Sequence, residues 1–382
     1  MNYLNLIKEK GIMNKTGLLV VVFTALLMLT SCGAKAPAKN AEAPADESNV
    51  IYTDEVNQAK EDEQENEKNG MGLNDESAVI YTDDAKQAKE DEQENANEGI
   101  GMNLYEDMIK ELPPEGYDKK REGIEYPEFK KYSYYSRTAE RETNVNVLLP
   151  VNYDESREYP VLYILHGFYD NEDWMARDVV ALSTVLTNLQ HDGEAREMIV
   201  VLPYIFCDKD MPYCTGMDTA NCLAYDNFIN DLTSDLMPFI EETFSVSKNR
   251  ENTAITGFSM GGRESLFIGF RHPELFGYIG AVCPAPGLVN IPGSAMHPGQ
   301  LESSEMRFSE ENKPYVLLIS SSKADGVVTG SPDSYRNILT ENGEMYLSHI
   351  MKNTGHDHTS VKPHLYNYFR MIFKSPKSDA QK

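Results

Sequence analysis

The chain has 382 residues and a formal net charge of −26, with 61 acidic against 35 basic side chains. This balance argues against binding to nucleic acid or to anionic membrane surfaces, because both are negatively charged and would repel the chain. The length would suit two or three average domains, but the composition is so uneven that each segment has to be assigned separately.

The N-terminal segment has the pattern of an export signal. Basic residues precede an apolar run at residues 18–29, which is short for a membrane span and about the length of a signal-peptide core. The run ends in Leu29-Thr30-Ser31-Cys32-Gly33, which resembles a bacterial lipobox. We expect residues 1–32 to be a lipoprotein signal peptide and Cys32 to carry the lipid, so that the exported protein is anchored on the cell envelope and faces the extracytoplasmic side.

Residues 33–125 predict an acidic, repeat-containing, disordered linker. Residues 50–66 return as residues 79–95, and two copies are fewer than the roughly three that stacked repeats need. More than half of the net negative charge lies between residues 39 and 100. Such a segment cannot bury enough apolar surface to offset its chain entropy, so we expect an extended tether. A calcium-binding or partner-binding role for the repeats is the alternative.

Residues 126–375 have the composition of a globular domain, and residues 376–382 form a tail. Eight short apolar or alternating runs predict strands at residues 132–135, 144–150, 161–165, 198–202, 253–256, 278–283, 315–319 and 346–351. Helical periods lie between them, including one over 228–240 that Asp226 is placed to cap. Strands alternating with helices predict an α/β domain with a largely parallel sheet, whose site gathers beyond the carboxyl ends of the strands.

Ser259 is the candidate nucleophile. It is the central residue of a G-x-S-x-G motif, with an apolar run before the motif and a helical period after it. A nucleophilic serine of this kind lies on a strained turn, and the small Gly257 and Gly261 allow strand and helix to pass closely. We expect a strand, a sharp turn with Ser259 at its apex and a helix; a structural turn is the alternative, because the motif also occurs by chance.

Asp325 and His356 are the candidate partners of Ser259. A serine hydroxyl needs an imidazole to take its proton, the imidazole needs a carboxylate to fix its tautomer, and the expected chain order is serine, acid, histidine. Asp325 follows the run at 315–319, with Asp333 as its rival. His356 follows the run at 346–351, and the competing histidines are His349, His358 and His364.

The loop that begins His166-Gly167-Phe168 follows the run at 161–165 and is the candidate oxyanion loop. Its backbone N–H at Phe168, together with that of Met260, could stabilise a tetrahedral intermediate. A glycine turn with a packed histidine is the alternative.

These motifs together resemble the feruloyl and acetyl-xylan esterases of carbohydrate esterase family 1. The likeness covers roughly residues 126–375 and rests on Tyr163-Ile164-Leu165-His166-Gly167 with Trp174, Tyr225-Asp226-Asn227-Phe228, Gly257-Phe258-Ser259-Met260-Gly261-Gly262, Gly355-His356-Asp357 and Lys362-Pro363. The resemblance implies an α/β-hydrolase fold, with a mostly parallel central sheet and helices on both faces, and Ser259, Asp325 and His356 as nucleophile, acid and base. One departure is Val361, where the family often has tryptophan.

Several further residues are candidates for substrate binding or cross-linking. Trp174 could contact substrate or anchor packing, and Arg263 could meet a substrate carboxylate or, as we favour, pair with a helix neighbour. His297 and Gln300 are possible sugar contacts. We expect at least one disulfide to hold the long loop at 203–224, among Cys207, Cys214, Cys222 and Cys283; free buried thiols are the alternative.

The predicted function is hydrolysis of carboxylic esters, with feruloyl or acetyl groups removed from plant cell-wall xylan or its oligosaccharides. No metal or organic cofactor is expected, because the serine, imidazole and carboxylate supply the nucleophile and the proton transfers. The alternatives are another acyl hydrolase, acting on siderophore esters, lipids or peptides, and a non-catalytic surface-binding lipoprotein with the same fold.

Overall fold

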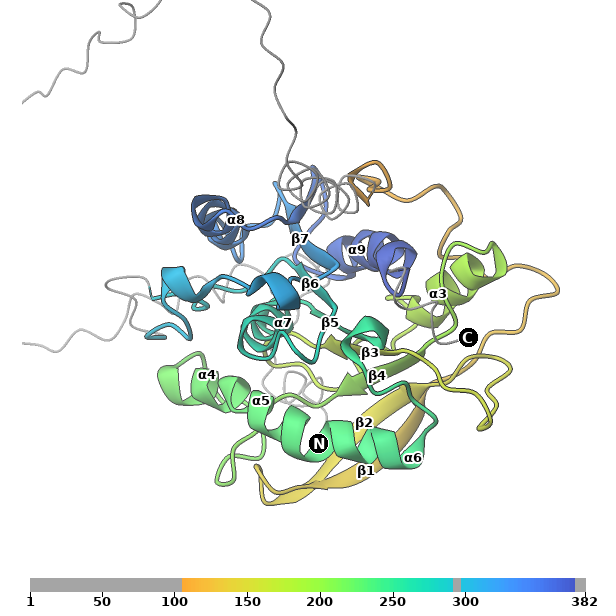
Figure 1. Ribbon diagram of the computed structural model, residues 1–382, viewed down its shortest axis with the longest axis horizontal. Helices are drawn as coiled ribbons and strands as arrows, with labels where there is room; N and C mark the ends of the chain where they lie inside the picture. Colours follow the sequence, from red (N-terminus) through yellow and green to blue (C-terminus); the bar gives the residue numbers. More distant parts are fainter. Residues whose placement is uncertain (1–104, 291–296, 375–382) are drawn as a thin grey trace, which may run out of the picture. The chain divides into compact units, whose positions relative to one another are not determined.

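The central feature of the computed structural model, which describes residues 105–290 and 297–374, is an eight-stranded sheet in the order β1-β2-β4-β3-β5-β6-β7-β8 (Figure 1). The strands are β1 (Lys130–Ser136), β2 (Arg141–Leu148), β3 (Val161–Leu165), β4 (Ile199–Pro203), β5 (Thr253–Gly257), β6 (Tyr278–Val282), β7 (Val316–Ser322) and β8 (Leu347–Met351). Only the β1–β2 and β2–β4 pairs of this sheet are antiparallel. All eight predicted strands and the largely parallel sheet are confirmed.

Helices cover both faces of the sheet (Figure 1). On one face lie α3 (Leu182–His191) and α9 (His358–Met371), which also contact each other. The opposite face is covered by α4 (Thr219–Asp226), α5 (Phe228–Asp231), α6 (Met237–Thr243), α7 (Met260–Arg271) and α8 (Ser331–Asn342), with a π-helical turn at Leu232–Leu236 between α5 and α6.

Strand β3 shows why the central strands are apolar throughout. All five of its side chains are buried. Val161, Tyr163 and Leu165 pack with the helices α4 to α8, whereas Leu162 and Ile164 pack with α3 and α9. Because successive side chains of a strand point to opposite faces, a sheet covered on both sides has no solvated face on which polar residues could alternate.

The packed part of the chain begins before residue 126, where we placed the domain boundary. Residues 105–125 lie against α9: the Lys110 N–H donates to Asn367 Oδ1 at 2.9 Å, and Asn367 Nδ2 donates to the Lys110 carbonyl at 2.8 Å. Tyr117 packs edge-on against Tyr366, with ring centroids 5.6 Å apart. The sequence did not predict this packing, because residues 105–125 follow an acidic linker and contain too few apolar residues to indicate a packed segment.

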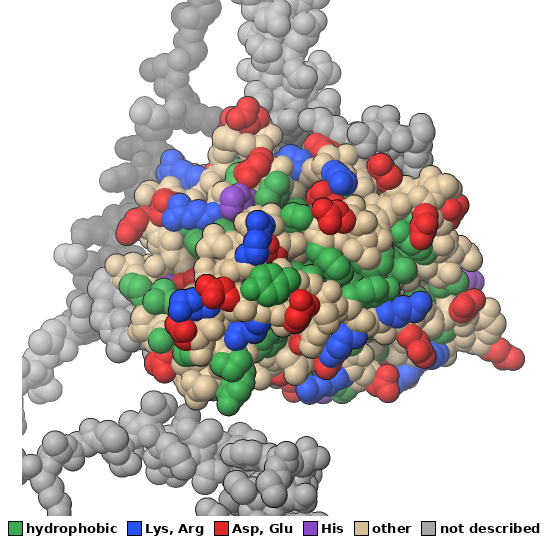
Figure 2. Space-filling model, turned by 90° about the horizontal axis from the view of Figure 1, so that it is seen from below, with side chains coloured by type: hydrophobic (Ala, Val, Ile, Leu, Met, Phe, Trp, Pro, Cys, Tyr) green, Lys and Arg blue, Asp and Glu red, His purple; other side chains and the backbone are tan. Residues whose placement is uncertain are grey.

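The predicted signal peptide, Cys32, most of the linker and the tail lie outside the described residues. Among the helices of the described ranges, none is both long and apolar enough to cross a membrane. Figure 2 shows acidic and basic side chains interspersed on one face of the domain, with hydrophobic side chains between them. This face therefore has no broad patch of a single charge that would attract a polyanion.

Candidate active site

Ser259 lies at the apex of the turn between β5 and α7. Its backbone has φ 55° and ψ −111°, a conformation that L-residues rarely adopt. The Ser259 N–H donates to the Val282 carbonyl at 3.0 Å, which ties the turn to the neighbouring strand β6. The segment thus has the strand, sharp turn and helix that its sequence predicts, and it holds the serine in a strained conformation.

Two glycines make this turn sterically allowed. A Cβ atom at Gly257 would lie 2.4 Å from the Gly261 carbonyl group, and a Cβ atom at Gly261 would lie 2.3 Å from the Leu165 carbonyl oxygen. Both distances are far inside van der Waals contact, and the atoms met are backbone atoms that cannot rotate away. The G-x-S-x-G spacing is therefore a packing requirement of β3, β5 and α7 at their point of closest approach.

Ser259, His356 and Asp325 form one hydrogen-bonded chain. Asp325 lies in the loop after β7, and His356 lies between β8 and α9. The His356 Nδ1–H donates to Asp325 Oδ2 at 2.7 Å, and Ser259 Oγ lies 2.9 Å from His356 Nε2. With Nδ1 carrying the proton, Nε2 is free to accept the serine hydroxyl proton, which is the arrangement that a serine nucleophile requires.

Asp325 is held ionised by its surroundings. Burial by itself would raise the pKa of its carboxyl group, but hydrogen bonds from His356 and from the Val327 N–H outweigh burial and lower the pKa below its ordinary value. The Val327 N–H donates to Oδ1 at 2.8 Å, while His356 occupies Oδ2. Both carboxylate oxygens are thus fixed, and with them the plane of the imidazole ring.

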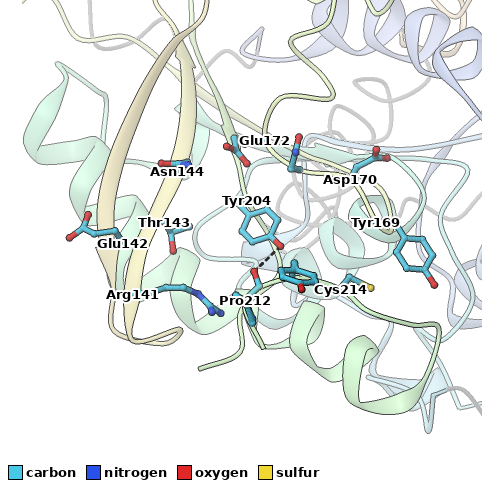
Figure 3. A pocket seen from close by; sticks show the side chains of 12 residues that line it. Arg141, Glu142, Thr143, Asn144, Tyr169, Asp170, Glu172, Tyr204, Pro212 and Cys214 are labelled. Atoms are coloured by element: carbon cyan, nitrogen blue, oxygen red, sulfur yellow. Dashed lines mark hydrogen bonds between the residues drawn. The ribbon is translucent and has the colours of Figure 1, made fainter. Parts of the chain in front are cut away.

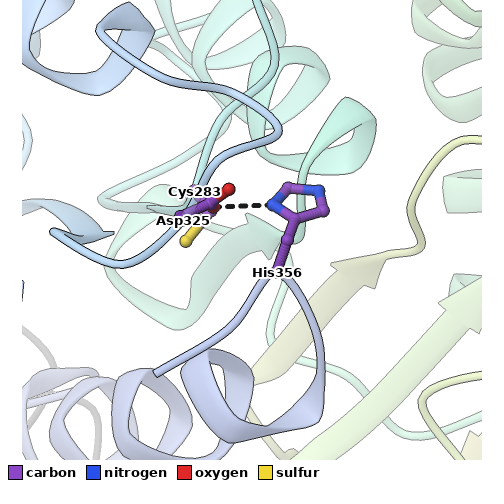
Figure 4. A group of neighbouring side chains, drawn as sticks. All are labelled: Cys283, Asp325 and His356. Carbon is purple, nitrogen blue, oxygen red and sulfur yellow. Dashed lines mark hydrogen bonds and ion pairs between the residues drawn. The ribbon is translucent and has the colours of Figure 1, made fainter. Parts of the chain in front are cut away.

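Cys283 is a third neighbour of the Asp325 carboxylate that the sequence did not reveal (Figure 4). It follows β6, is buried, and has φ 47°. Burial raises the pKa of its thiol, and the negative charge of the neighbouring Asp325 carboxylate raises it further. The thiol, carboxylate and imidazole lie within 4.8 Å of one another and are ligand types that zinc accepts, but Asp325 and His356 already hydrogen-bond to each other.

Three of the four rival residues are engaged elsewhere, and the fourth, His358, is the first residue of α9. Ser320 Oγ hydrogen-bonds His349 Nδ1 at 3.0 Å and His364 Nδ1 at 2.7 Å, in a buried cluster beneath the sheet edge. Asp333 is an exposed residue of α8 that pairs with Arg336 of the same helix. Of the candidate acids and bases, Asp325 and His356 are therefore the pair that the structure brings to Ser259.

An apolar cavity of about 260 Å³ opens beside Ser259. We call it the apolar cavity, and most of its wall is formed by Phe168, Met217, Met260, Ala285, Pro286, Val289, Val327 and Val328. Within the described residues, the backbone N–H groups of Phe168 and Met260 have no acceptor. These two unpaired donors at the same cavity are available to an oxygen of a bound molecule.

Arg263 lines the apolar cavity, and its guanidinium is paired with carboxylates of the protein. Its fully buried guanidinium binds Asp226 and Glu264, and His297 Nε2 and Gln300 Nε2 also donate to Asp226. The sugar-contact roles considered for His297 and Gln300 are therefore not supported, because both complete this network. Asp226 is the last residue of α4 rather than the cap of the following helix, whose N-cap is Asn227, and its carboxylate is bound by Arg263 instead.

Trp174 takes the packing role. Its ring stacks on Phe258 with centroids 5.2 Å apart and planes 7° apart, and Phe258 in turn contacts the His356 ring at 4.6 Å. Trp174 does not line the apolar cavity. Its contribution to the site is thus to support the residue before the nucleophile and, through it, the imidazole.

The predicted disulfide is not present. Cys207, Cys214, Cys222 and Cys283 are all free thiols, and all but Cys214 are buried. Their side chains are distributed among different surroundings: Cys207 beside Asp231, Cys222 beside Arg263 and Cys283 beside Asp325. The long loop is held instead by Arg141, which donates to the Met211 carbonyl at 2.9 Å and to that of Asp208.

His166 fastens the oxyanion loop to the loop after β4. Its Nδ1–H donates to the Gly167 carbonyl at 2.8 Å, and its Nε2 accepts the Ile205 N–H at 3.1 Å. Burial lowers the pKa of His166 from 6.5 to about 4, and the Gly167 carbonyl offsets only part of this shift. A second ring proton would lie on Nε2 and face the Ile205 N–H, so this fold requires the neutral imidazole of His166.

Replacing Gly261 by alanine should destabilise the fold strongly, because the new Cβ would overlap the Leu165 carbonyl oxygen. We expect the free energy of unfolding to fall by roughly 3 kcal/mol or more, measured by urea denaturation. The control is Gly330→Ala, at a position where a Cβ meets nothing within 4 Å. Equal midpoints for the two variants would show that the close approach at Gly261 is not a constraint.

The free energy of unfolding should fall as the pH is lowered from about 6.5 towards 4. Because the folded-state pKa of His166 lies below its unfolded value, the unfolded chain binds the extra proton in this window. His166 alone should contribute a slope of up to about 1.4 kcal/mol per pH unit. His166→Gln should lose that part of the slope, and His191→Gln, at an exposed histidine, is the matched control. Parallel pH dependences for wild type and His166→Gln would refute this assignment.

Residues 136–324 match the Esterase family. The endo-1,4-beta-xylanase/feruloyl esterase of Xylanibacter ruminicola is 31% identical over 166 residues, which are 42% of this chain and 22% of that protein. The endo-1,4-beta-xylanase Y of Acetivibrio thermocellus is 27% identical over 135 residues, 33% of this chain and 11% of that protein. The chain thus spans about a fifth or less of the length of these two relatives.

Solved structures extend the similarity over a larger share of the chain. A CE1 ferulic acid esterase from Anaeromyces mucronatus, in complex with ferulic acid, is 40% identical with a TM-score of 0.65, and the match covers 69% of this chain and 97% of that one. The feruloyl esterase module from Clostridium thermocellum, complexed with sinapinate, is 17% identical with a TM-score of 0.55 and is covered to 94%, with 69% of this chain. The second likeness concerns the fold alone.

Proposed function

This chain belongs to the family of the CE1 ferulic acid esterases, and from that premise we propose that it is a serine esterase that removes feruloyl groups from xylan or xylo-oligosaccharides. The fold is the α/β-hydrolase fold predicted from the resemblance. Two relatives support the choice of polysaccharide, since their names are those of xylanases and one is also a feruloyl esterase.

One observation carries the proposal: the Ser259–His356–Asp325 chain opens into the apolar cavity. A cavity of about 260 Å³ with aliphatic and aromatic walls fits a planar aromatic acyl group, whereas an acetyl group would leave most of it unfilled. Unfilled apolar volume contributes no binding free energy. The cavity therefore favours feruloyl over acetyl, the two acyl groups that the sequence left open.

In the proposed first half-reaction, Ser259 Oγ attacks the ester carbonyl carbon while His356 Nε2 takes the hydroxyl proton. The carbonyl oxygen becomes an oxyanion, which the N–H groups of Phe168 and Met260 stabilise. The carbon–oxygen bond to the sugar then breaks, and His356 returns its proton to the departing sugar oxygen. The products are the free saccharide alcohol and a feruloyl ester of Ser259.

In the second half-reaction, His356 takes a proton from water, and the resulting hydroxide attacks the acyl carbon. Collapse of the second tetrahedral intermediate returns the proton to Ser259 Oγ and releases ferulate. Asp325 stays ionised throughout and stabilises the transient imidazolium, in keeping with its lowered pKa.

We also propose that the esterase acts outside the cytoplasm, held by a lipid on Cys32 and displaced from the membrane by the acidic linker. The support is the lipobox-like Leu29-Thr30-Ser31-Cys32-Gly33 after a short apolar run and the repeated acidic sequence that follows it. Polymeric xylan cannot enter a cell, so a surface location places the enzyme where its proposed substrate occurs.

The chain should release ferulate from a feruloylated arabinoxylo-oligosaccharide, and it should prefer methyl ferulate to acetylated xylan by at least about tenfold in kcat/KM. Ser259→Ala should lower kcat/KM by roughly 10⁴-fold or more, because it removes the nucleophile. Asp325→Asn should lower it by about 10⁴-fold, because the amide favours the wrong imidazole tautomer.

The matched control is Asp333→Asn, which changes the rival carboxylate in α8 and should leave kcat/KM within about twofold of wild type. If neither ester is cleaved by a folded wild-type chain, the proposed function is wrong. If Ser259→Ala retains comparable activity, the esterase assignment survives but the nucleophile is another residue.

A further inference from the structure

A second cavity, of about 420 Å³, is lined by residues of the oxyanion loop that directly follow Phe168 (Figure 3). We call it the second cavity; its walls come from the start of β2, the loop after β3 and the loop after β4, and its lining includes Arg141, Glu142, Asn144, Tyr169, Asp170, Asn171, Tyr204 and Tyr213. None of the steps proposed above uses it.

The second cavity offers aromatic surface to a ligand. Tyr169 and Tyr213 are 55% and 63% exposed, which is unusual for side chains of this size. Figure 3 shows Tyr169 and Arg141 on opposite sides of the cavity, with Tyr204 between them. Exposed tyrosine faces of this kind pack against flat, C–H-rich surfaces, and the edge of each ring still carries a hydroxyl.

The same cavity offers polar groups that the protein leaves unused. Among the described residues, no donor hydrogen-bonds the Asp170 carboxylate, and no acceptor takes the side-chain amide N–H groups of Asn144 and Asn171. Burial raises the pKa of Asp170 to about 6, with only the charge of Arg177 opposing it. The Asp170 carboxylate and the two amides can accept from and donate to several hydroxyl groups of one ligand.

The ligand that fits these groups is uncharged. The free Asp170 carboxylate would repel an anion, and the guanidinium of Arg141 is already bound to the backbone carbonyls of Asp208 and Met211. A sugar ring offers both kinds of group that the second cavity can bind: C–H faces for the tyrosines, and hydroxyls at its rim for the Asp170 carboxylate and the amides. Few other neutral molecules present both.

The second cavity is preformed rather than dependent on a ligand. Arg141 holds the loop after β4 through two carbonyls, and the Tyr204 hydroxyl donates to the Pro212 carbonyl of the same loop at 3.2 Å. The other face of Tyr204 stacks on the His166 ring at 5.6 Å. Walls fixed in this way lower the entropy cost of binding.

The second cavity is also placed to bind the part of a substrate that extends out of the apolar cavity. Phe168 lines the apolar cavity, and its neighbour Tyr169 lines the second cavity. In the loop after β4, Met217 lines the apolar cavity and Cys214 lines the second cavity. Neighbouring Cα atoms are about 3.8 Å apart, so the two cavities adjoin along the oxyanion loop. A chain of linked sugars can cross that distance.

We propose that the second cavity is a saccharide subsite, which binds a neutral pentose unit of the xylan chain while the feruloyl group occupies the apolar cavity. The inference rests on the proposed function for the identity of the sugar, and on the geometry above for the site itself. It makes the sugar chain, and not only the acyl group, a determinant of specificity.

The test compares a feruloylated arabinoxylotriose with methyl ferulate, which has no sugar. Tyr213→Ala should lower kcat/KM for the oligosaccharide by about tenfold, the effect of losing one aromatic face, and should leave methyl ferulate within about twofold. Tyr213→Phe keeps the ring and should recover most of the loss. The matched control is Tyr135→Ala, since Tyr135 is 55% exposed on β1 and lines neither cavity.

Equal losses for both substrates, or no loss for either, would overturn the subsite. If the folded chain cleaves neither ester, the proposed function fails, and calorimetric titration of wild type with unesterified xylotriose then decides the subsite alone. Binding that Tyr213→Ala abolishes and Tyr135→Ala preserves would support it. Absence of binding up to millimolar xylotriose, or binding that is unchanged in Tyr213→Ala, would reject it.

Discussion

The close approach of three backbone segments, at the end of β3, the end of β5 and the start of α7, is the constraint on which the site depends. Only glycine fits at positions 257 and 261, where any Cβ would overlap a neighbouring backbone group. The tight turn that results holds Ser259 at φ 55° and directs its hydroxyl towards His356. Strain stored in the turn is balanced by the packed sheet and helix on either side of it.

The parallel sheet supplies the rest of the site from one edge. Phe168 follows β3, Ser259 follows β5, Cys283 follows β6, Asp325 follows β7 and His356 follows β8, so five successive loops at the carboxyl ends of strands converge. Each loop contributes one group and the sheet fixes their spacing. The hydrogen-bonded chain spans the strands because their order in the sheet, from β5 to β8, matches their order in the sequence.

Much of this could be predicted from the sequence, because the signals are local or ordered. Apolar runs located all eight strands, and the order of Ser259, Asp325 and His356 along the chain selected the residues that the structure brings together. The contact between Cys283 and Asp325 depends on two strands meeting in space, and no spacing reports it. The spacing of the four cysteines likewise does not report which thiols meet in space, so a disulfide was expected where the structure has free thiols. The packing of residues 105–125 on α9 was not predicted, because these residues follow an acidic linker.

The most direct test of the central claim is covalent labelling with a fluorophosphonate, which reacts with an activated serine hydroxyl and loses fluoride. Mass spectrometry of the digested protein should place one label per chain on Ser259, and His356→Ala should slow labelling by at least about a hundredfold, because the hydroxyl then lacks its base. A label on a different serine, or ester hydrolysis by a protein that takes up none, would contradict the account.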